Sequence, residues 1–120
     1  MQPEERDAAY LWDMLAAARE VVAFTAGVAY HAYINDRMRQ RAVERAIEII
    51  GEAARQVSDD FQHAHPDIPW RPIIVQRHLL AHEYGEILQE RIWRVATLHV
   101  PALIAQLEPL IPPLPPDLEA

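Results

Sequence analysis

The sequence predicts an all-α protein, an up-and-down bundle of about four to five helices joined by short connections. Apolar residues recur at alternating steps of three and four residues along most of the chain, which is the spacing of one helix face. No stretch alternates apolar and polar residues as a half-buried strand does, and no internal repeat stands out.

Two long helices are predicted in the first half of the chain. The first spans residues 4–24, Thr25-Ala26-Gly27 ends it, and a short segment over 28–34 follows. The second begins after Asn35-Asp36, a typical N-cap pair, and is expected to end near His63. The inward residues of the two helices are Ala8, Leu11, Leu15, Ala18 and Val22, and then Val43, Ile47, Ile50, Ala54, Val57 and Phe61.

The second half begins with a turn and a helix start over residues 67–72, because proline fits the first helical turn and restricts the residue before it. A helix is predicted from Ile73 to about Glu83, and a last helix from about Glu86. Pro101 lacks a backbone donor, so a kink or a restart is expected there. The inward residues of the last helix are Ile87, Leu88, Ile92, Val95, Ala96, Leu103, Ile104 and Leu107.

Length and composition predict one compact helical domain over residues 1–108 and a proline-rich extended tail over 109–120. With 120 residues and 51% hydrophobic residues, the chain can bury a core but leaves much apolar surface uncovered. The first residues are acidic where a signal peptide is basic, and no apolar run reaches the roughly 18 residues of a membrane span. We therefore expect a soluble cytoplasmic protein with no membrane partner.

The charge pattern excludes some functions. All 11 basic residues are arginines, and the formal net charge is −7. This charge argues against non-specific binding of nucleic acid by the whole surface, so any RNA site would be a local, arginine-lined groove. The absence of cysteine excludes disulfides and thiolate metal sites, and it leaves the compartment open.

Chemically active side chains interrupt the apolar run RHLLAHEYGE. On an ideal helix Tyr84 lies about 20° from Arg77, whereas His82 lies about 140° from Arg77 and about 40° from His78. Arg77 and His82 therefore share a target only if the arginine side chain wraps around, or if the helix unwinds toward Gly85. From the residues alone, two histidines four apart also fit surface or core-edge positions with hydrogen-bonded partners.

A metal site is a further alternative. His78 and His82 offer two ligands at helical spacing, but zinc requires three or four. The others would have to come from His63, His65 or carboxylates. A metal-dependent enzyme is thus the third class of function, behind an enzyme without metal and a binding module.

The run Arg77-x4-His82-x-Tyr84 resembles the RX4HXY motif of HepT toxins, the minimal HEPN-domain family found beside MntA-type nucleotidyltransferase antitoxins. The resemblance extends over about residues 6–107 and implies a HEPN-type bundle. Many HEPN motifs have asparagine directly after the arginine, where this chain has His78. Other segments that resemble the family, in order, are 6–14, 24–27, 42–54 and 65–71.

The resemblance implies the toxin of a toxin-antitoxin system, an endoribonuclease that cuts mRNA or tRNA without a metal or other cofactor. In such enzymes the ribose 2′-OH attacks the adjacent phosphate. His82 is then the proton-transfer group, because imidazole titrates near neutral pH. Arg77 binds the phosphate and stabilises the charge that grows on it, and His78 is an auxiliary proton-transfer or orienting group.

Members of the family resemble one another in forming homodimers whose two motifs face a shared cleft. Pairing would cover apolar surface and bring two copies of Arg77 together in an acidic protein. Arg37, Arg41 and Arg45 follow at steps of four and form a stripe that would border this cleft and bind RNA. The interleaved Glu44 and Glu48 indicate the alternative, an ordinary salt-bridged surface.

Tyr84 is, by the same resemblance, a modification site, to which the nucleotidyltransferase antitoxin transfers AMP units from ATP. Phosphates added beside Arg77 would compete with RNA for the same cation. A half-buried aromatic ring with its hydroxyl at the surface is the structural alternative. The alternative function is a non-catalytic HEPN module that binds nucleotide or RNA, or docks onto a nucleotidyltransferase.

The remaining conspicuous residues have structural interpretations. Trp70 is expected to anchor a helix start, and Trp12 and Trp93 to lie in the core or an interface. Gly51, inside a helix, indicates a close approach of another helix. No role is assigned to the other histidines, which are His31, His63, His65 and His99.

Overall fold

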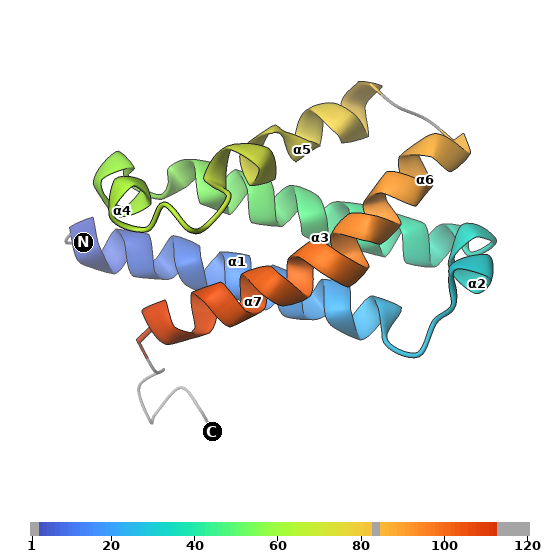
Figure 1. Ribbon diagram of the computed structural model, residues 1–120, viewed down its shortest axis with the longest axis horizontal. Coiled ribbons are helices and arrows are strands. Elements are labelled where there is room, and N and C mark those ends of the chain that lie inside the picture. Colours follow the sequence, from blue (N-terminus) through green and yellow to red (C-terminus); the bar gives the residue numbers. More distant parts are fainter. Residues whose placement is uncertain (1–2, 83–84, 113–120) are drawn as a thin grey trace.

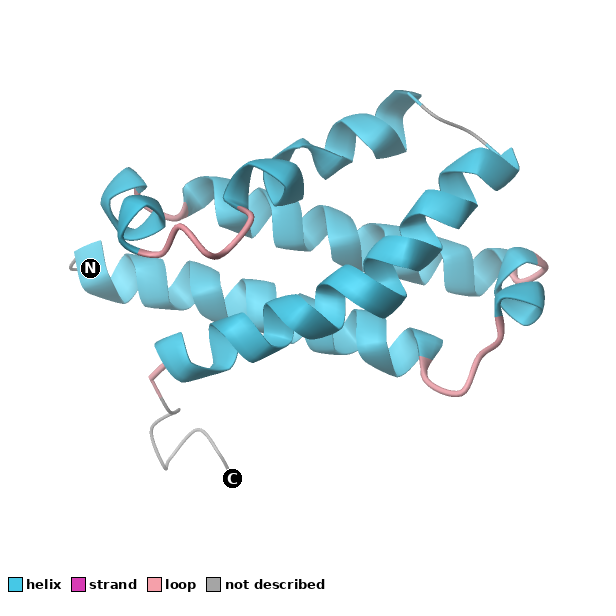
Figure 2. Cartoon of the chain, viewed as in Figure 1, coloured by secondary structure: helices cyan, strands magenta, loops and turns pink. Residues whose placement is uncertain are grey.

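The computed structural model describes residues 3–82 and 85–112, with side chains described for 5–76, 85 and 88–112. This part of the chain is helical apart from short connections and contains no strand (Figure 2), so the predicted all-α class is confirmed. None of the helices in the described ranges combines the length and the apolar character needed to cross a membrane.

Within the described residues the chain forms more α-helices than the four to five predicted, because short helices stand between the long ones, and the long ones form the rods of the bundle (Figure 1). Helix α1 (Pro3–Thr25) and helix α3 (Arg37–Gln56) lie alongside each other, and α5 (Trp70–His82) packs on α3. The last rod runs from α6 (Gly85–Arg94) through a π-helical turn, η1 (Val95–His99), into α7 (Val100–Leu107), which packs on α1. Shorter elements join or follow the rods, namely α2 (Tyr30–Ile34), α4 (Asp59–Ala64) and the 3-10 turn η2 (Glu108–Leu110). The largest fully buried side chains of the core are Tyr33, Leu11, Met14, Leu15, Ile68, Leu107, Val21 and Val43.

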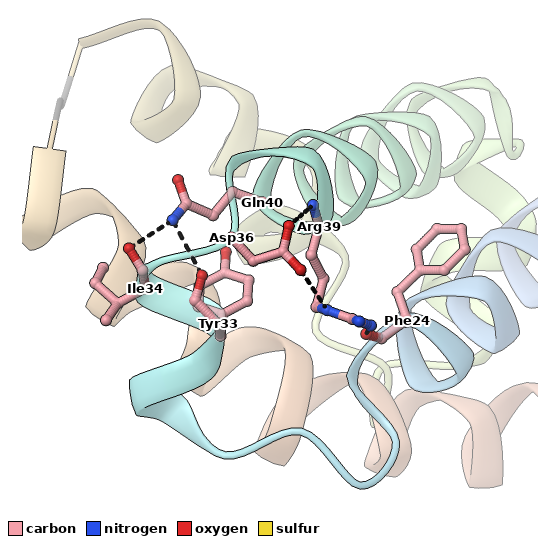
Figure 3. Close-up of polar contacts among 6 residues, drawn as sticks. All are labelled: Phe24, Tyr33, Ile34, Asp36, Arg39 and Gln40. Atoms are coloured by element: carbon pink, nitrogen blue, oxygen red, sulfur yellow. Dashed lines mark hydrogen bonds and ion pairs between the residues drawn. The ribbon is translucent and has the colours of Figure 1, made fainter.

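Polar contacts fasten the corner between α1, α2 and α3 (Figure 3). Asp36 is the N-cap of α3, and its carboxylate accepts from the backbone N–H of Arg39 at 3.0 Å. The Arg39 guanidinium donates to Asp36 at 3.2 Å and to the carbonyl of Phe24, at the end of α1, at 2.5 Å. The backbone N–H of Arg39 and its guanidinium hold the pKa of Asp36 below its ordinary value. The N-cap predicted at Asn35-Asp36 is therefore confirmed at Asp36.

The prediction of one helix from Asp36 to near His63 is wrong. Helix α3 ends at Gln56, Val57 is extended, and Ser58 caps a separate helix, α4, by accepting from the N–H of Phe61 at 3.2 Å. The Ser58 hydroxyl and backbone N–H both donate to the carboxylate of Asp7 on α1, at 2.6 and 2.9 Å. The apolar rhythm continues through this break, because Val57 and Phe61 still face the core.

Helix α5 begins at Trp70, three residues before the predicted start, and Pro72 lies in its first turn. The Trp70 ring is buried, and its Nε1–H donates to the carbonyl of His65 at 2.9 Å. Trp70 therefore anchors the helix start as predicted.

The last rod changes from the π-helical turn η1 to the α-helix α7 at Val100, directly before Pro101, which confirms the interruption expected there. The N–H of Val100 donates to the carbonyl of Val95, five residues earlier in the chain, whereas an α-helix bonds four residues back. This wider spacing lies just before Pro101, which has no N–H to donate. Beyond it, Pro109 and Leu110 belong to a 3-10 turn, which differs from the extended backbone predicted from Pro109 onward. Residues 113–120 of the predicted tail lie outside the described residues.

Gly51 allows α5 to lie directly on α3. A Cβ at this position would lie 3.1 Å from the carbonyl oxygen of Ile73, a backbone atom of α5. The predicted close helix approach is thus confirmed, and α5 is the helix that approaches.

We expect Gly51→Val to lower the free energy of unfolding by about 1–3 kcal/mol, because the branched side chain overpacks the contact with Ile73. In Gly51→Ala the higher helix propensity of alanine, worth about 1 kcal/mol, opposes the cost of the same close contact. The change in the free energy of unfolding is therefore smaller than in Gly51→Val. Urea unfolding followed by circular dichroism measures both. Equal stability of wild type and Gly51→Val would contradict the close approach.

Candidate functional site

Three of the predicted site residues lie in the last turns of α5. Arg77, His78 and His82 belong to this helix, and Tyr84 lies outside the described residues. The side chains of the three α5 residues lie outside them too. In Figure 1 the end of α5 and the start of α6 point toward the end of the bundle that also contains α2 and the beginning of α3.

The backbone remains α-helical through His82, so it does not unwind earlier to align the motif. Along such a helix Arg77 and His82 are about 7.5 Å apart in rise and about 140° apart in rotation. Gly85, the next described residue, has φ +70°, a conformation that glycine adopts without strain. Helix α6 therefore begins at this glycine, which belongs to the run that carries the motif.

Helices α3 and α5 run in opposite directions, and α5 contacts α3 at Gly51, opposite Ile73. From there α5 diverges from α3, so its last turns, which carry the motif, lie farther from α3 than its start does (Figure 1).

A buried amide fixes the first part of α6. The Tyr33 hydroxyl donates to Oε1 of Gln89 at 2.5 Å, and Nε2 of Gln89 donates to the carboxylate of Glu44 at 3.1 Å. Gln89 is 7% exposed and Tyr33 is fully buried, and the ring of Trp93 lies 4.9 Å from that of Tyr33. Burial, and secondarily the charge of Glu44, raises the pKa of Tyr33, so its phenol stays protonated as the donor.

A second buried amide, that of Gln40 on α3, binds the backbone of α2. Nε2 of Gln40 donates to the carbonyls of Tyr33 and Ile34, at 3.1 and 3.0 Å (Figure 3). The sequence interpretation missed Gln40, Tyr33 and Gln89. A usable signal was present, because Gln40 stands three residues before Val43 on the inward stripe of its helix, where an uncharged polar group needs a partner.

The arginine stripe on α3 divides into two parts. Arg37, Arg41 and Arg45 are all exposed, but Arg45 contacts Glu48 at 2.8 Å and Glu52 at 3.9 Å. The salt-bridged interpretation is therefore confirmed for Arg45. For Arg37 and Arg41, the part of the chain that the structure describes contains no ion pair.

The histidines that were considered as additional metal ligands lie elsewhere. His63 and His65 are on or next to α4, at the opposite end of the molecule from the end of α5 (Figure 1). Nδ1 of His63 lies 2.8 Å from the carbonyl of Asp59, and the ring of His65 packs on Phe61 at 4.4 Å. Among the described side chains, which do not include those of His78 and His82, no group of three or more His, Cys, Asp or Glu is arranged to hold a metal ion.

An apolar groove of about 300 Å³ lies between α3, α5 and the last rod. Its lining is mostly aliphatic and proline, which suits packing and not the binding of a phosphate. The described lining residues are Ile50, Pro69, Pro72, Ile73, Gln76, Val95, His99, Val100 and Leu103.

Comparison with known proteins gives consistent matches. The family described as ribonuclease HepT-like matches residues 14–110. A Methanocaldococcus jannaschii protein provisionally named RNase MJ1380 is 37% identical over 100 residues, which cover 83% of this chain and 92% of that protein. A Thermococcus cleftensis protein provisionally named ribonuclease HepT is 35% identical over 101 residues, covering 84% and 92%. No solved structure gave a match of comparable significance.

Proposed function

Because the chain belongs to the HepT-like ribonuclease family, we propose that it is a metal-independent HEPN endoribonuclease, the toxin of a cytoplasmic toxin-antitoxin pair that cuts mRNA or tRNA. The observation that carries this proposal is the family match over 14–110, which includes the whole RX4HXY run. The ribonuclease names given to relatives of nearly the same length support it.

In the proposed reaction the ribose 2′ oxygen attacks the adjacent phosphorus, and the bond from phosphorus to the 5′ oxygen breaks. His82 takes the proton of the 2′-OH or supplies a proton to the leaving 5′ oxygen. The guanidinium of Arg77 binds the phosphate oxygens and stabilises the charge that develops on them. His78 assists as an orienting or second proton-transfer group.

A homodimer is part of the proposal. Arg77 and His82 lie about 140° apart around the axis of α5, and two facing copies would bring an arginine of one protomer to the histidine of its partner. Pairing would also cover apolar surface beside the motif, where Val75 on α5 is 44% exposed.

Neutralisation by a MntA-like nucleotidyltransferase completes the proposed system. The phenol oxygen of Tyr84 would attack the α-phosphorus of ATP, pyrophosphate would leave, and the phenol proton would pass to solvent. The AMP phosphate then lies close in sequence to Arg77 and competes with RNA for it.

The second candidate function is a non-catalytic HEPN module that binds RNA or nucleotide, or docks onto a nucleotidyltransferase. The same angular separation of Arg77 and His82 on a regular helix favours it, because one protomer alone does not align the two residues.

We expect Arg77→Ala and His82→Ala each to reduce RNA cleavage by about 100- to 10,000-fold in the presence of EDTA, because each removes charge stabilisation or proton transfer. Both variants should also relieve the growth arrest that wild type causes. The controls are Arg55→Ala and His31→Ala, which change exposed residues elsewhere. Cleavage at wild-type rates by folded, dimeric His82→Ala would favour the binding module, and chelator-sensitive activity would favour a metal enzyme.

Tyr84→Phe should abolish modification by the cognate nucleotidyltransferase with ATP, since no phenol oxygen remains to attack the α-phosphorus. Intact-mass spectrometry should show AMP additions on wild type and on the control Tyr10→Phe, and none on Tyr84→Phe. The Tyr84→Phe toxin should cut RNA and escape neutralisation. Continued AMP transfer to Tyr84→Phe would place the modification elsewhere.

The Arg37→Ala/Arg41→Ala variant should bind RNA more weakly, with kcat at saturating RNA little changed. If both residues contact phosphates, the slope of log affinity against log salt should fall by about 0.7 per contact, as for single strands. Arg45→Ala is the control, because Arg45 is already paired with Glu48. An equal loss per arginine removed in the two variants would show that the stripe acts only through overall charge.

A further inference from the structure

One residue that the proposed reaction does not use stands at the start of α6. Gln89 lies four residues after Gly85, one helical turn from the glycine where the chain leaves the motif. Its amide joins three helices, because Tyr33 belongs to α2 and Glu44 to α3. Gln89 is buried among apolar neighbours, since Leu88 and Ile92 on the same helix are core residues.

We propose that Gln89 is a positioning residue for RNA cleavage: its amide, held between the Tyr33 hydroxyl and the Glu44 carboxylate, sets where α6 begins and hence where the RX4HXY run is presented. This inference rests on the proposed ribonuclease function. Gln89 acts through the backbone and does not itself touch RNA.

A glutamine side chain suits the hydrogen-bonding needs of both partners in this contact. The carboxylate of Glu44 requires a donor, and the protonated phenol of Tyr33 requires an acceptor. A side-chain amide provides both groups from one planar unit, with Nε2 toward Glu44 at 3.1 Å and Oε1 toward Tyr33 at 2.5 Å. A carboxylate in its place would confront Glu44 with a second negative charge, and an aliphatic side chain would leave both partners without their bond.

The contact is close enough to the motif along the chain to control its position. Helix α5 is seated on α3 by the approach at Gly51, and α6 is seated on α3 and α2 by Gln89. Only two residues separate the end of α5 at His82 from Gly85, and Gln89 follows His82 by seven residues. Displacements of about 1 Å at a reacting group can cost 100-fold in rate.

The test replaces Gln89 by glutamate and follows cleavage against pH. In Gln89→Glu the new carboxyl and Glu44 lie close together and share one proton at low pH, when the protonated group can again donate to Glu44 and accept from Tyr33. The pKa of the shared proton is raised above that of a free carboxyl, so the native contact is present below that pKa and is lost as pH rises through it. Of the two partners of the amide, Glu44 is the carboxylate, and Tyr33 is the phenol on which the described groups Glu44 and Tyr30 act electrostatically.

Cleavage by Gln89→Glu is divided by wild-type cleavage at each pH, which removes the titration of His82 from the comparison. We expect near-wild-type activity at pH 5.5 and a loss in kcat of about 100-fold at pH 8, with the fold intact by circular dichroism. Gln56→Glu, an exposed substitution of equal charge at the other end of α3, should track wild type throughout.

A second readout is independent of RNA. In protein labelled with 5-fluorotryptophan, the ¹⁹F resonance of Trp93, assigned with Trp93→Phe, reports on the ring that packs against Tyr33. In Gln89→Glu it should move with pH in step with the activity ratio. If it moves while the ratio stays constant, the contact is structural only and the positioning role is overturned; if neither changes, the contact itself is absent.

Failure of the proposed function is distinguishable from failure of this inference. If wild type cuts no RNA at any pH, the ribonuclease proposal fails and the positioning role fails with it, whatever Trp93 reports. If wild type cuts RNA and Gln89→Glu follows it at every pH, only the inference fails.

Discussion

The close contact of α5 with α3 at Gly51 is the constraint on which the rest of the arrangement depends. With no side chain at this position, the carbonyl of Ile73 can lie where a Cβ would come within 3.1 Å of it. This contact seats the start of α5, the helix that carries the motif, on α3. The first half of α3 supplies Glu44 to Gln89 on α6 and Gln40 to α2, so α3 contacts both α5 and α6, the two helices that meet at the motif.

The net charge of the chain and the partners of its individual arginines together determine where a phosphate could be attracted. A net charge of −7 opposes the approach of RNA, so any affinity for RNA would have to come from a few arginines with no acidic partner beside them. Arg45 is balanced by Glu48 and Glu52, and Arg39 is occupied by Asp36 and Phe24. Proximity in sequence therefore does not make these arginines equivalent, and the ion pairs decide which of them can meet a phosphate.

Most of the fold could be predicted from the sequence, because helix periodicity and caps are local. The sequence predicted the N-cap of α3 at Asp36 and the anchoring of α5 by Trp70. It also predicted the interruption near Pro101 and the close helix approach at Gly51. The break after Gln56 was not, since Val57 and Phe61 keep the apolar rhythm and the hydroxyl of Ser58 finds its acceptor on Asp7, which lies on another helix. For the site, Arg77, His78 and His82 were placed on the correct helix, whereas Tyr33, Gln40 and Gln89 went unnoticed.

The sequence by itself determined the helical class, the family and the RX4HXY run, because these depend on residue types and spacings along one chain. Only the tertiary structure decided which polar side chains meet. The residues of the Tyr33–Gln89–Glu44 contact are far apart in the chain, and no local pattern specifies that an amide on α6 reaches a phenol on α2 and a carboxylate on α3. That choice follows from burial, because a polar group removed from water must find its partner among whatever the packing brings near.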